Sequence, residues 1–483
     1  MAQSVKMNFI LNVINTTSKV LFPLITFPYA ARVLNPEGLG EVGFFSSIIQ
    51  YVVLFSSIGI PLYAIREVAK VRNNIDEKSK TVLEIIILHI ILTIVGYFAV
   101  GLLCILVPEI NENIPLFGVL SLSILFTAIG CEWFYQGIED FLYITIRGIV
   151  VKIVSICFLF LCVKTKDDLI FYGIYSVMGS VGGNIFNFIR LRKLICINNR
   201  TIRSLKPFRH FFPAMKIFIL NIAVSIYLQL NTVMLGFYNG SEAVGYYTAA
   251  TKLMAVVLGL SNSLGPVIMP RMSNLISNNK ESEFKELAQK AYNFSIFMSL
   301  PLSIGLFFIS PYAISLLCGE LYMPSVTASR IVSPIILIVS LSGFMGTQFL
   351  YPLGRVKLII KSTIIGGCVA VLTNIILLPL TSYNGAAISY LFAEIAVTTS
   401  LFIFSRKILP IHFINKSIKK YFWGTISMSV VLFTISLFEL GNIVSFFSML
   451  LFGSVTYMTW MIYLKEESIM QIVQQFKKKI QFD

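Results

Sequence analysis

Positive charge alternates between successive loops of this chain, and this alternation most limits its possible folds. About fourteen apolar stretches of membrane-spanning length run from Phe9 to Leu464, separated by short loops. The loops after the second, sixth, eighth, tenth and twelfth stretches are rich in Lys and Arg, and they include Arg66, Arg190, Arg271, Arg355 and Arg406. The intervening loops hold almost none, apart from Lys164 and Lys166. The positive-inside rule therefore predicts a multi-pass membrane protein with both termini in the cytoplasm.

The composition agrees with this interpretation. The chain is 56% hydrophobic and 13% charged, and its mean hydropathy of +0.82 lies far outside the range of soluble domains. A net charge of +15 would suggest nucleic acid as the partner of a soluble protein. Here the excess lies in loops, where it sets the topology and meets anionic headgroups of membrane lipids. We therefore expect membrane lipids, and no nucleic acid, as partners.

The spacing of the apolar stretches predicts two similar halves. The expected spans are residues 9–31, 41–63, 82–107, 114–136, 141–163, 168–190, 214–236, 243–268, 288–316, 329–352, 358–380, 384–405, 418–438 and 443–464. A basic cytoplasmic connector, 191–213, separates an N-terminal six-helix lobe, 1–190, from a C-terminal six-helix lobe, 214–405. The remaining segment, 406–483, holds two additional helices and a cytoplasmic tail.

Short sequence echoes support this division. Phe9–Asn12 is echoed by Phe218–Asn221, and Val42–Phe45 by Val244–Tyr247. A repeat of six spans returns the chain to the same side, so the two lobes should be parallel. Chance similarity among apolar helices is the alternative. The predicted fold is thus an all-α membrane protein with about fourteen transmembrane helices: two parallel six-helix lobes around a central cavity, and two extra C-terminal helices.

Polar side chains inside the predicted spans indicate what the cavity binds. Two lysines stand out because a charge in a span should face water or a partner: Lys19 in the first span and Lys252 in the eighth. The polar residues expected to line the cavity with them are Asn12, Asn15, Gln50, Asn221, Gln229 and Asn262. Two cations in a cavity predict an anionic ligand such as a phosphate or pyrophosphate. The alternative is that both lysines snorkel to the nearer interface.

Glu394, in the twelfth span, is the most deeply placed carboxylate. It is a candidate for binding a coupling proton or sodium ion, and equally for a structural hydrogen bond between helices. The sequence offers no sizeable extramembrane loop, no Ser/His/Asp set, no phosphate-binding glycine loop and no metal-ligand spacing. We therefore predict no enzyme activity, no metal site and no cofactor.

Several segments resemble the bacterial polysaccharide flippases, the Wzx-type transporters of O-antigen and capsule repeat units. These belong to the multidrug/oligosaccharidyl-lipid/polysaccharide exporter superfamily. The segments are residues 28–40 (PYAARVLNPEGLG), 65–70 (IREVAK), 132–139 (EWFYQGIE), 232–236 (TVMLG) and 244–250 (VGYYTAA). The motif with Trp133, Gln136 and Gly137 is fairly specific to the polysaccharide branch. Asn35 stands where the family commonly has glycine, and Tyr135 where it commonly has phenylalanine.

The resemblance implies a flippase in the bacterial inner membrane. It would move undecaprenyl-pyrophosphate-linked oligosaccharide repeat units to the periplasmic leaflet by alternating access, coupled to H⁺ or Na⁺. By this likeness Lys19 and Lys252 would hold the pyrophosphate, and Arg66 and Arg271 would guide headgroup entry. A polysaccharide polymerase and a chain-length regulator are the protein partners it suggests.

Two other transporters and one enzyme class remain as alternatives. A flippase for the peptidoglycan precursor lipid II is poorly separated by sequence. A multidrug antiporter shares the fold but carries organic cations, which two cavity lysines would repel. A membrane-embedded polymerase or ligase would normally need the periplasmic loop that the sequence lacks.

Overall fold

The computed structural model describes residues 5–196, 198, 203–262, 265–409, 411–438 and 440–466. At residues 5–10, 12–17, 19–21, 220–228 and 266–267 it describes the helical backbone alone. Within these ranges all regular structure is helical and no strand occurs, which confirms the predicted all-α class. The chain forms two compact units, unit 1 at Met1–Gly245 and unit 2 at Tyr246–Asp483. The lobe boundaries expected from the sequence remain a prediction.

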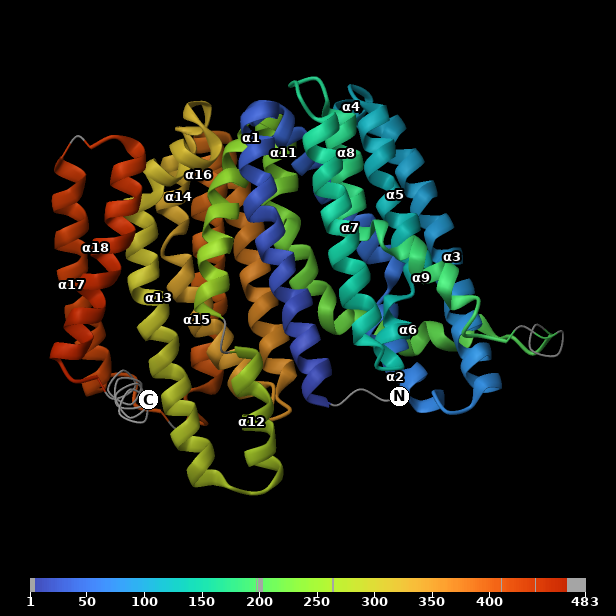
Figure 1. The fold of residues 1–483 in the computed structure, drawn as a ribbon. Helices are drawn as coiled ribbons and strands as arrows, with labels where there is room; N and C mark the ends of the chain where they lie inside the picture. The colour runs from blue at the N-terminus through green and yellow to red at the C-terminus, as the bar shows by residue number, and fades with distance from the viewer. Residues whose placement is uncertain are drawn as a thin grey trace, which may run out of the picture. The chain divides into compact units, whose positions relative to one another are not determined.

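Unit 1 is built from long apolar helices joined by short, capped connections (Figure 1). Its elements are α1 (Val5–Ser57), α2 (Ile60–Val71), α3 (Ile75–Leu106), α4 (Pro108–Asn111), α5 (Ile114–Gly130), α6 (Glu132–Gly137), α7 (Phe141–Cys162), α8 (Leu169–Val177), a π-helix η1 (Met178–Gly182), α9 (Asn184–Leu191), a 3₁₀-helix η2 (Pro207–His210) and α11 (Phe211–Ser261), which runs on into unit 2. Side-chain oxygens cap the free N–H groups of three helix starts: Asn74 for α3, Asn113 for α5 and Asp140 for α7.

Unit 2 is also built from long helices joined by short connections. Its elements are α12 (Gly265–Ser277), α13 (Glu281–Cys318), η3 (Glu320–Tyr322), α14 (Ser325–Val332), α15 (Ile335–Gly343), the π-helix η4 (Phe344–Leu350), α16 (Val356–Ser405), α17 (Lys416–Leu437) and α18 (Asn442–Tyr463). The last two helices form a hairpin that packs on α13, drawn in red in Figure 1. They coincide with the last two predicted spans to within two residues.

The long helices have the length and apolar composition that the predicted spans require. In the described ranges ten helices are long and apolar enough to cross a membrane, and eleven if the bent pair Leu169–Gly182 and Asn184–Leu191 is one span. Three helices, α1, α11 and α16, each contain one non-helical residue: Asn35, Gly240 and Ser382. Each of these residues lies in a loop that the sequence predicted between two spans. The total of fourteen spans itself remains a prediction.

The breaks in α1 and α11 have nearly the same backbone conformation. Asn35 has φ 59° and ψ 172°, and Gly240 has φ 77° and ψ −178°. Glycine adopts this combination of positive φ and extended ψ without a steric penalty, whereas the side chain of Asn35 makes the same backbone conformation strained. The proline after Asn35 further disfavours a helical conformation there. Two different local sequences thus produce one kind of break.

The segments after these two breaks contact each other through a pair of glycines. A Cβ atom at Gly40 would overlap the backbone oxygen of Ser241, and one at Gly245 would overlap that of Pro36. The contact is reciprocal, because each glycine lies five residues after its break. This geometry matches Gly40 with Gly245, whereas the sequence echo matched Gly43 with Gly245. The repeat in this segment is therefore shifted by three residues from the expected register.

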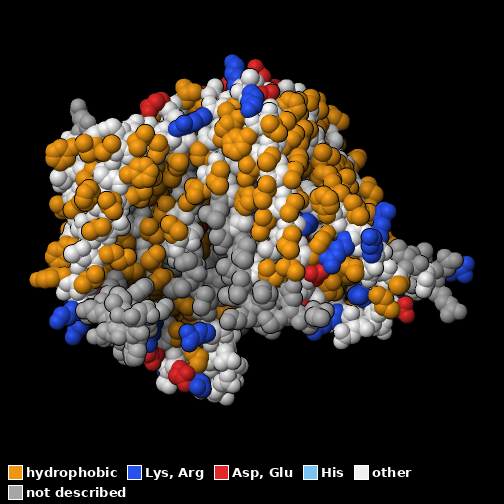
Figure 2. All heavy atoms as spheres, viewed as in Figure 1, with side chains coloured by type: hydrophobic (Ala, Val, Ile, Leu, Met, Phe, Trp, Pro, Cys, Tyr) orange, Lys and Arg blue, Asp and Glu red, His pale blue; other side chains and the backbone are white. Residues whose placement is uncertain are grey.

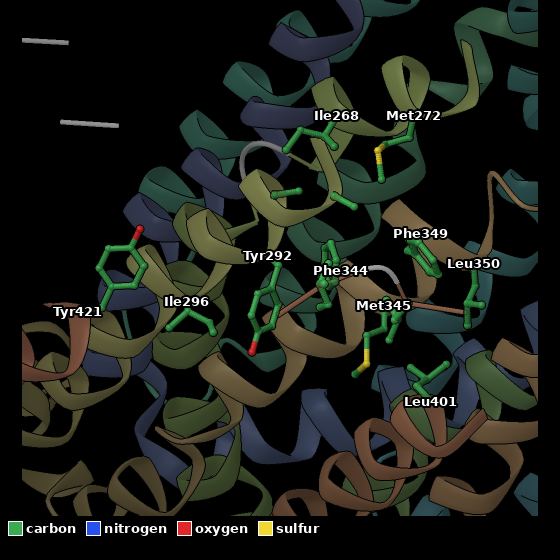
Figure 3. Packing of buried hydrophobic residues seen from close by; sticks show 14 of the residues in the cluster. Ile268, Met272, Tyr292, Ile296, Phe344, Met345, Phe349, Leu350, Leu401 and Tyr421 are labelled. Atoms are coloured by element: carbon green, nitrogen blue, oxygen red, sulfur yellow. The ribbon is translucent and has the colours of Figure 1, made fainter. Parts of the chain in front are cut away.

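Each unit has its own buried apolar core. In unit 1 a cluster that includes Ile60, Phe134 and Tyr135 packs α2 against both α3 and α6. In unit 2 a cluster rich in aromatic and Met side chains joins α12, α13, η4, α16 and the final hairpin (Figure 3). Phe344 and Phe349 are fully buried within it. Outside the cores, hydrophobic side chains cover the visible sides of the helices (Figure 2), as expected for surfaces that face lipid.

Candidate substrate cavity and polar network

One cavity of unit 1 brings together two of the polar residues expected to bind substrate. Gln50 from α1 and Gln229 from α11 both line a cavity of about 440 Å³, together with Ser57, Tyr51 and Thr127. Gln50 is exposed and Gln229 is half-buried. The arrangement offers amide and hydroxyl groups, which both donate and accept hydrogen bonds, and such groups suit a neutral, hydroxyl-rich ligand. What the cavity binds is still a prediction.

A close backbone approach forms one edge of this cavity. Gly59 follows the end of α1 with φ 69°, a conformation that favours glycine. A Cβ at this position would lie 2.7 Å from the backbone oxygen of Ala214 in α11. Gly59 therefore lets α11 approach the turn between α1 and α2, next to the side chains that line the cavity.

The other expected binding residues are distributed along the chain. Lys252 and Asn262, in and just after the second part of α11, are exposed, as are Arg66 of α2 and Arg271 of α12. Arg66 belongs to unit 1 and the other three to unit 2. The side chains of Asn12, Asn15, Lys19 and Asn221 lie outside the described side chains, although their backbones are helical. The predicted binding role of all these residues is untested by the fold.

Glu394 is buried in α16, with 7% of its surface exposed. The tyrosine one turn earlier, Tyr390, is near enough to interact with its carboxylate electrostatically. A buried carboxylate in a span is a feature of both coupling sites and structural contacts. Among the described residues, no group of three or more His, Cys, Asp or Glu side chains could hold a metal ion.

The tryptophan motif forms the short helix α6 and acts in packing. The helix starts at a break where Cys131 has φ 43°. Trp133 is buried, with 4% exposed, and Gln136 Nε2 donates to Glu132 Oε1 at 3.3 Å. A Cβ at Gly137 would lie 2.9 Å from the side chain of Val68, so glycine allows α6 to contact α2 closely. These contacts explain the motif without requiring it to touch a substrate.

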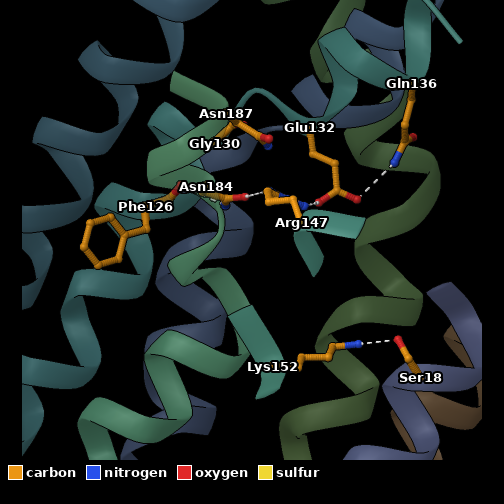
Figure 4. A network of polar contacts seen from close by, with 9 residues as sticks. All are labelled: Ser18, Phe126, Gly130, Glu132, Gln136, Arg147, Lys152, Asn184 and Asn187. Carbon is orange, nitrogen blue, oxygen red and sulfur yellow. Dashed lines mark hydrogen bonds and ion pairs between the residues drawn. The ribbon is translucent and has the colours of Figure 1, made fainter. Parts of the chain in front are cut away.

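A charged residue that the sequence reasoning missed connects this motif to two further helices (Figure 4). Arg147, in α7, is only 10% exposed and pairs with Glu132 at 3.3 Å. Its Nη1 donates to Asn184 Oδ1 at 3.3 Å, and Asn184 Nδ2 donates to the backbone oxygen of Phe126 at 2.9 Å. We call Glu132, Gln136, Arg147 and Asn184 the polar node. It joins α5, α6, α7 and α9 through hydrogen bonds that are strong in a non-aqueous environment.

A second missed cation, Lys152, lies one and a half turns further along α7. Its Nζ donates to Ser18 Oγ of α1 at 2.7 Å and lies 5.4 Å from the ring centre of Phe22. One turn beyond, Thr26 accepts a hydrogen bond from Tyr175 at 2.6 Å. This face of α1 therefore packs on α7 and α8. Charges inside the apolar run 141–162 were the signal for both missed cations.

A buried carboxylate anchors the segment that leads into α11. Glu84 of α3 has no exposed surface, and it accepts hydrogen bonds from His210 Nε2 at 2.9 Å and from the backbone N–H of Lys206 at 2.8 Å. Arg209 pairs with the same carboxylate. Tyr63 lies 2.8 Å from the other ring nitrogen of His210. Burial lowers the pKa of His210, although its contact with Glu84 opposes that shift.

Comparison with protein families gives one clear match. Residues 5–276, more than half of the chain, match the family described as polysaccharide biosynthesis protein. A putative O-antigen transporter of Escherichia coli (strain K12) is 26% identical over 403 residues, which are 83% of this chain and 97% of that protein. A putative O-antigen transporter of Shigella dysenteriae is also 26% identical, over 81% of this chain and 98% of its own length.

Solved structures share the fold over most of the chain. The lipid II flippase MurJ, in an inward closed conformation, aligns with a TM-score of 0.73 at 18% identity, covering 95% of this chain and 99% of its own. An inward-facing multidrug resistance MATE family transporter aligns with a TM-score of 0.64 at 13% identity, covering 83% and 98%. These relatives and neighbours are transporters and flippases, in agreement with the prediction that the chain is not an enzyme.

Proposed function

Since the chain belongs to the polysaccharide biosynthesis protein family, we propose that it flips undecaprenyl-pyrophosphate-linked oligosaccharide repeat units across a bacterial inner membrane. The supporting observation is the nearly end-to-end similarity to putative O-antigen transporters, 83% of this chain against 97% of the relative. The transport cycle would be alternating access, and the product would enter O-antigen or capsule assembly. The basic loops would lie in the cytoplasm with both termini.

The chemistry of the cavity suits the sugar part of such a substrate. Gln50 and Gln229 present amides to a space of about 440 Å³, and amides bind sugar hydroxyls as donors and acceptors. Lys19 and Lys252 would bind the pyrophosphate as compact cations. Arg66 and Arg271, both exposed, would attract the headgroup before it enters.

Glu394 would couple transport to H⁺ or Na⁺, because a carboxylate buried inside a span, here with 7% exposure, is typical of ion pathways and proton relays. Coupling predicts that Glu394→Gln abolishes gradient-dependent transport while leaving insertion intact. A polysaccharide polymerase and a chain-length regulator would act on the product as protein partners.

The test is leaflet exposure of lipid-linked repeat units in vesicles that contain the full-length protein. We expect wild-type protein to expose the oligosaccharide on the opposite leaflet, and Lys19→Ala/Lys252→Ala to lose at least about tenfold in rate, the effect of one charge-assisted hydrogen bond. Lys285→Ala is the matched control, since this lysine is exposed at the start of α13 and its one ion pair among the described residues is with Glu281 at 4.0 Å.

The cavity amides are tested separately. Gln50→Leu/Gln229→Leu should slow the flipping of long repeat units more than that of a single pyrophosphate-linked sugar, because only the former fills the cavity. Transport of lipid II alone would favour the peptidoglycan-precursor flippase. Export of organic cations without any lipid-linked sugar would favour the multidrug antiporter, and either result would overturn the proposal.

A further inference from the structure

A groove on the outer side of unit 1 has a composition that the transport cavity does not explain. It lies between α7 and α9 and has a volume of about 630 Å³, within the range of small-ligand sites. Its apolar wall is formed by side chains that are about half exposed: Ile146, Val150, Phe186 and Ile189. Three cations, Arg147, Arg190 and Lys193, line it together with one carboxylate, Asp140.

The groove lies beside a bend in the sixth predicted span. The helix pair Leu169–Gly182 and Asn184–Leu191 turns by 42° after the π-helix η1. The guanidinium of Arg147 lies against the bend, where a Cβ at Gly183 would come within 3.2 Å of it. Because of the bend, α9 does not continue along the axis of α8. The polar node holds α9 in this position through the hydrogen bond between Arg147 and Asn184. Sharp bends at π-bulges are frequent at functional sites.

The cations of the groove are only partly satisfied by the protein. Arg190 pairs with Asp140 at 2.8 Å and stacks on Tyr143 at 4.0 Å from the ring centre. Arg190 Nη1 and Arg147 Nε are nevertheless buried without a hydrogen-bond partner among the described residues. Asp140 also caps α7 by accepting from the N–H of Tyr143. Glu132 balances the charge of Arg147 and Asp140 balances that of Arg190, so Lys193, exposed at the rim, gives the groove its net positive charge for an anion.

We propose that this groove binds an anionic phospholipid, with its phosphate at Arg190 and Lys193 and an acyl chain along Ile146, Val150 and Phe186. Arg147 lies six residues into α7, or roughly 9 Å along the helix axis at 1.5 Å per residue, near the boundary between headgroups and hydrocarbon. Basic pockets between helices at the cytoplasmic leaflet are typical sites for anionic headgroups. This lipid site depends on the proposed orientation of the protein in the membrane but not on the proposed transport substrate.

The test measures lipid binding by the purified full-length protein, and it needs no transport. Native mass spectrometry would compare phosphatidylglycerol with phosphatidylcholine of the same acyl chains. We expect tighter binding of phosphatidylglycerol, and Arg190→Gln/Lys193→Ala should weaken it by about tenfold or more, as the loss of one charge-assisted hydrogen bond would. Lys193→Ala alone must also weaken it, and because this exposed residue has no described partner its loss should not disturb folding.

Two further variants separate the groove from general surface charge. Arg192→Ala is the matched control: Arg192 is the neighbour of Lys193, exposed and stacked on Phe188 at 5.1 Å, but it does not line the groove. Val150→Trp fills the apolar part and should weaken the binding of both lipids.

Three outcomes would overturn the proposal. They are equal affinity for the two lipids, equal weakening by Arg192→Ala and Lys193→Ala, and displacement of phosphatidylglycerol by undecaprenyl phosphate at lower concentration. The last would assign the groove to the carrier lipid instead. Loss of lipid binding with transport retained would leave the proposed flippase function intact.

Discussion

The polar node of unit 1 and the apolar cluster of unit 2 hold their helices together by different means. In the node, Arg147 and Asn184 join four helices through an ion pair and hydrogen bonds (Figure 4). In the cluster, Phe344 and Phe349 pack with Met and aromatic side chains from several helices (Figure 3). The ion pair described above for unit 2, between Lys285 and Glu281, lies at the exposed start of α13 instead.

The difference shows which interactions specify a single helix arrangement in each unit. Between helices in lipid there is little hydrophobic driving force, so close packing and polar contacts decide which helices associate. The apolar cluster uses close packing, whose energy depends on filled volume. The polar node uses directional bonds, whose energy depends on every partner being present. The two regions should therefore respond differently to the same kind of substitution.

Loss of volume in the apolar cluster should have the largest effect. Phe344 is fully buried, with Tyr292 at 5.5 Å between ring centres. Phe344→Ala should destabilise the protein by about 3–5 kcal/mol, because it removes the ring and leaves a cavity. Unfolding by SDS titration of the protein in mixed micelles would measure this. Phe344→Leu is the control, and a loss as large as that of the alanine variant would contradict the packing argument.

Loss of one partner in the polar node should cost nearly as much. Arg147→Met keeps the volume but leaves Glu132 without its cation, and breaking a buried pair costs about 3–5 kcal/mol. We expect a destabilisation at the lower end of this range, because the side chain of Glu132 is 35% exposed and water can solvate its charge. Glu132→Gln/Arg147→Met should recover much of the loss in the same SDS titration. If the double variant is as unstable as the single one, the node is held by packing rather than charge.

Overpacking the contact between α6 and α2 should have an intermediate effect on stability. Gly137→Ala places a Cβ 2.9 Å from Val68, and overpacking of this kind costs about 1–3 kcal/mol. Val68→Ala should relieve the strain when it is combined with Gly137→Ala, which thermal unfolding in detergent would show. An unchanged melting temperature in Gly137→Ala alone would mean that α2 and α6 can separate freely. Gly118→Ala, where nothing lies within 4 Å, is the control.

Titration of His210 should have the smallest effect. Its pKa is lowered in the folded protein, whereas the unfolded chain binds a proton near the usual value of 6.5. The unfolded state therefore binds more protons as the pH falls through that value, and stability decreases toward acid. The groups that face the ring are Glu84, Arg209, Tyr63 and Glu67.

His210→Gln keeps a donor for Glu84 but cannot titrate. The drop in melting temperature between about pH 7.5 and pH 5.5 should therefore be smaller in this variant than in the wild type. An identical drop in both proteins would assign the acid sensitivity to other groups.

The sequence predicted the helical class, the last hairpin and the loops in which the breaks at Asn35, Gly240 and Ser382 lie, since all depend on local composition and turn residues. It did not predict the polar node, because Arg147 and Asn184 are 37 positions apart in the sequence and Asn184 lies next to a helix bend. The contact between Lys152 and Ser18 spans 134 positions. Hydropathy reports how deep a residue lies but not which helix it faces, so such pairs emerge only from the three-dimensional structure.

The reciprocal contact at Gly40 and Gly245 limits how the sequences of the two segments can evolve. A side chain at either position would force both backbones apart and break the close contact that the other glycine makes. If the segments descend from a duplicated ancestor, their copies cannot drift independently at these two positions. A lineage that replaces one glycine should also have altered the other or rebuilt both breaks, so the pair would be inherited as one unit.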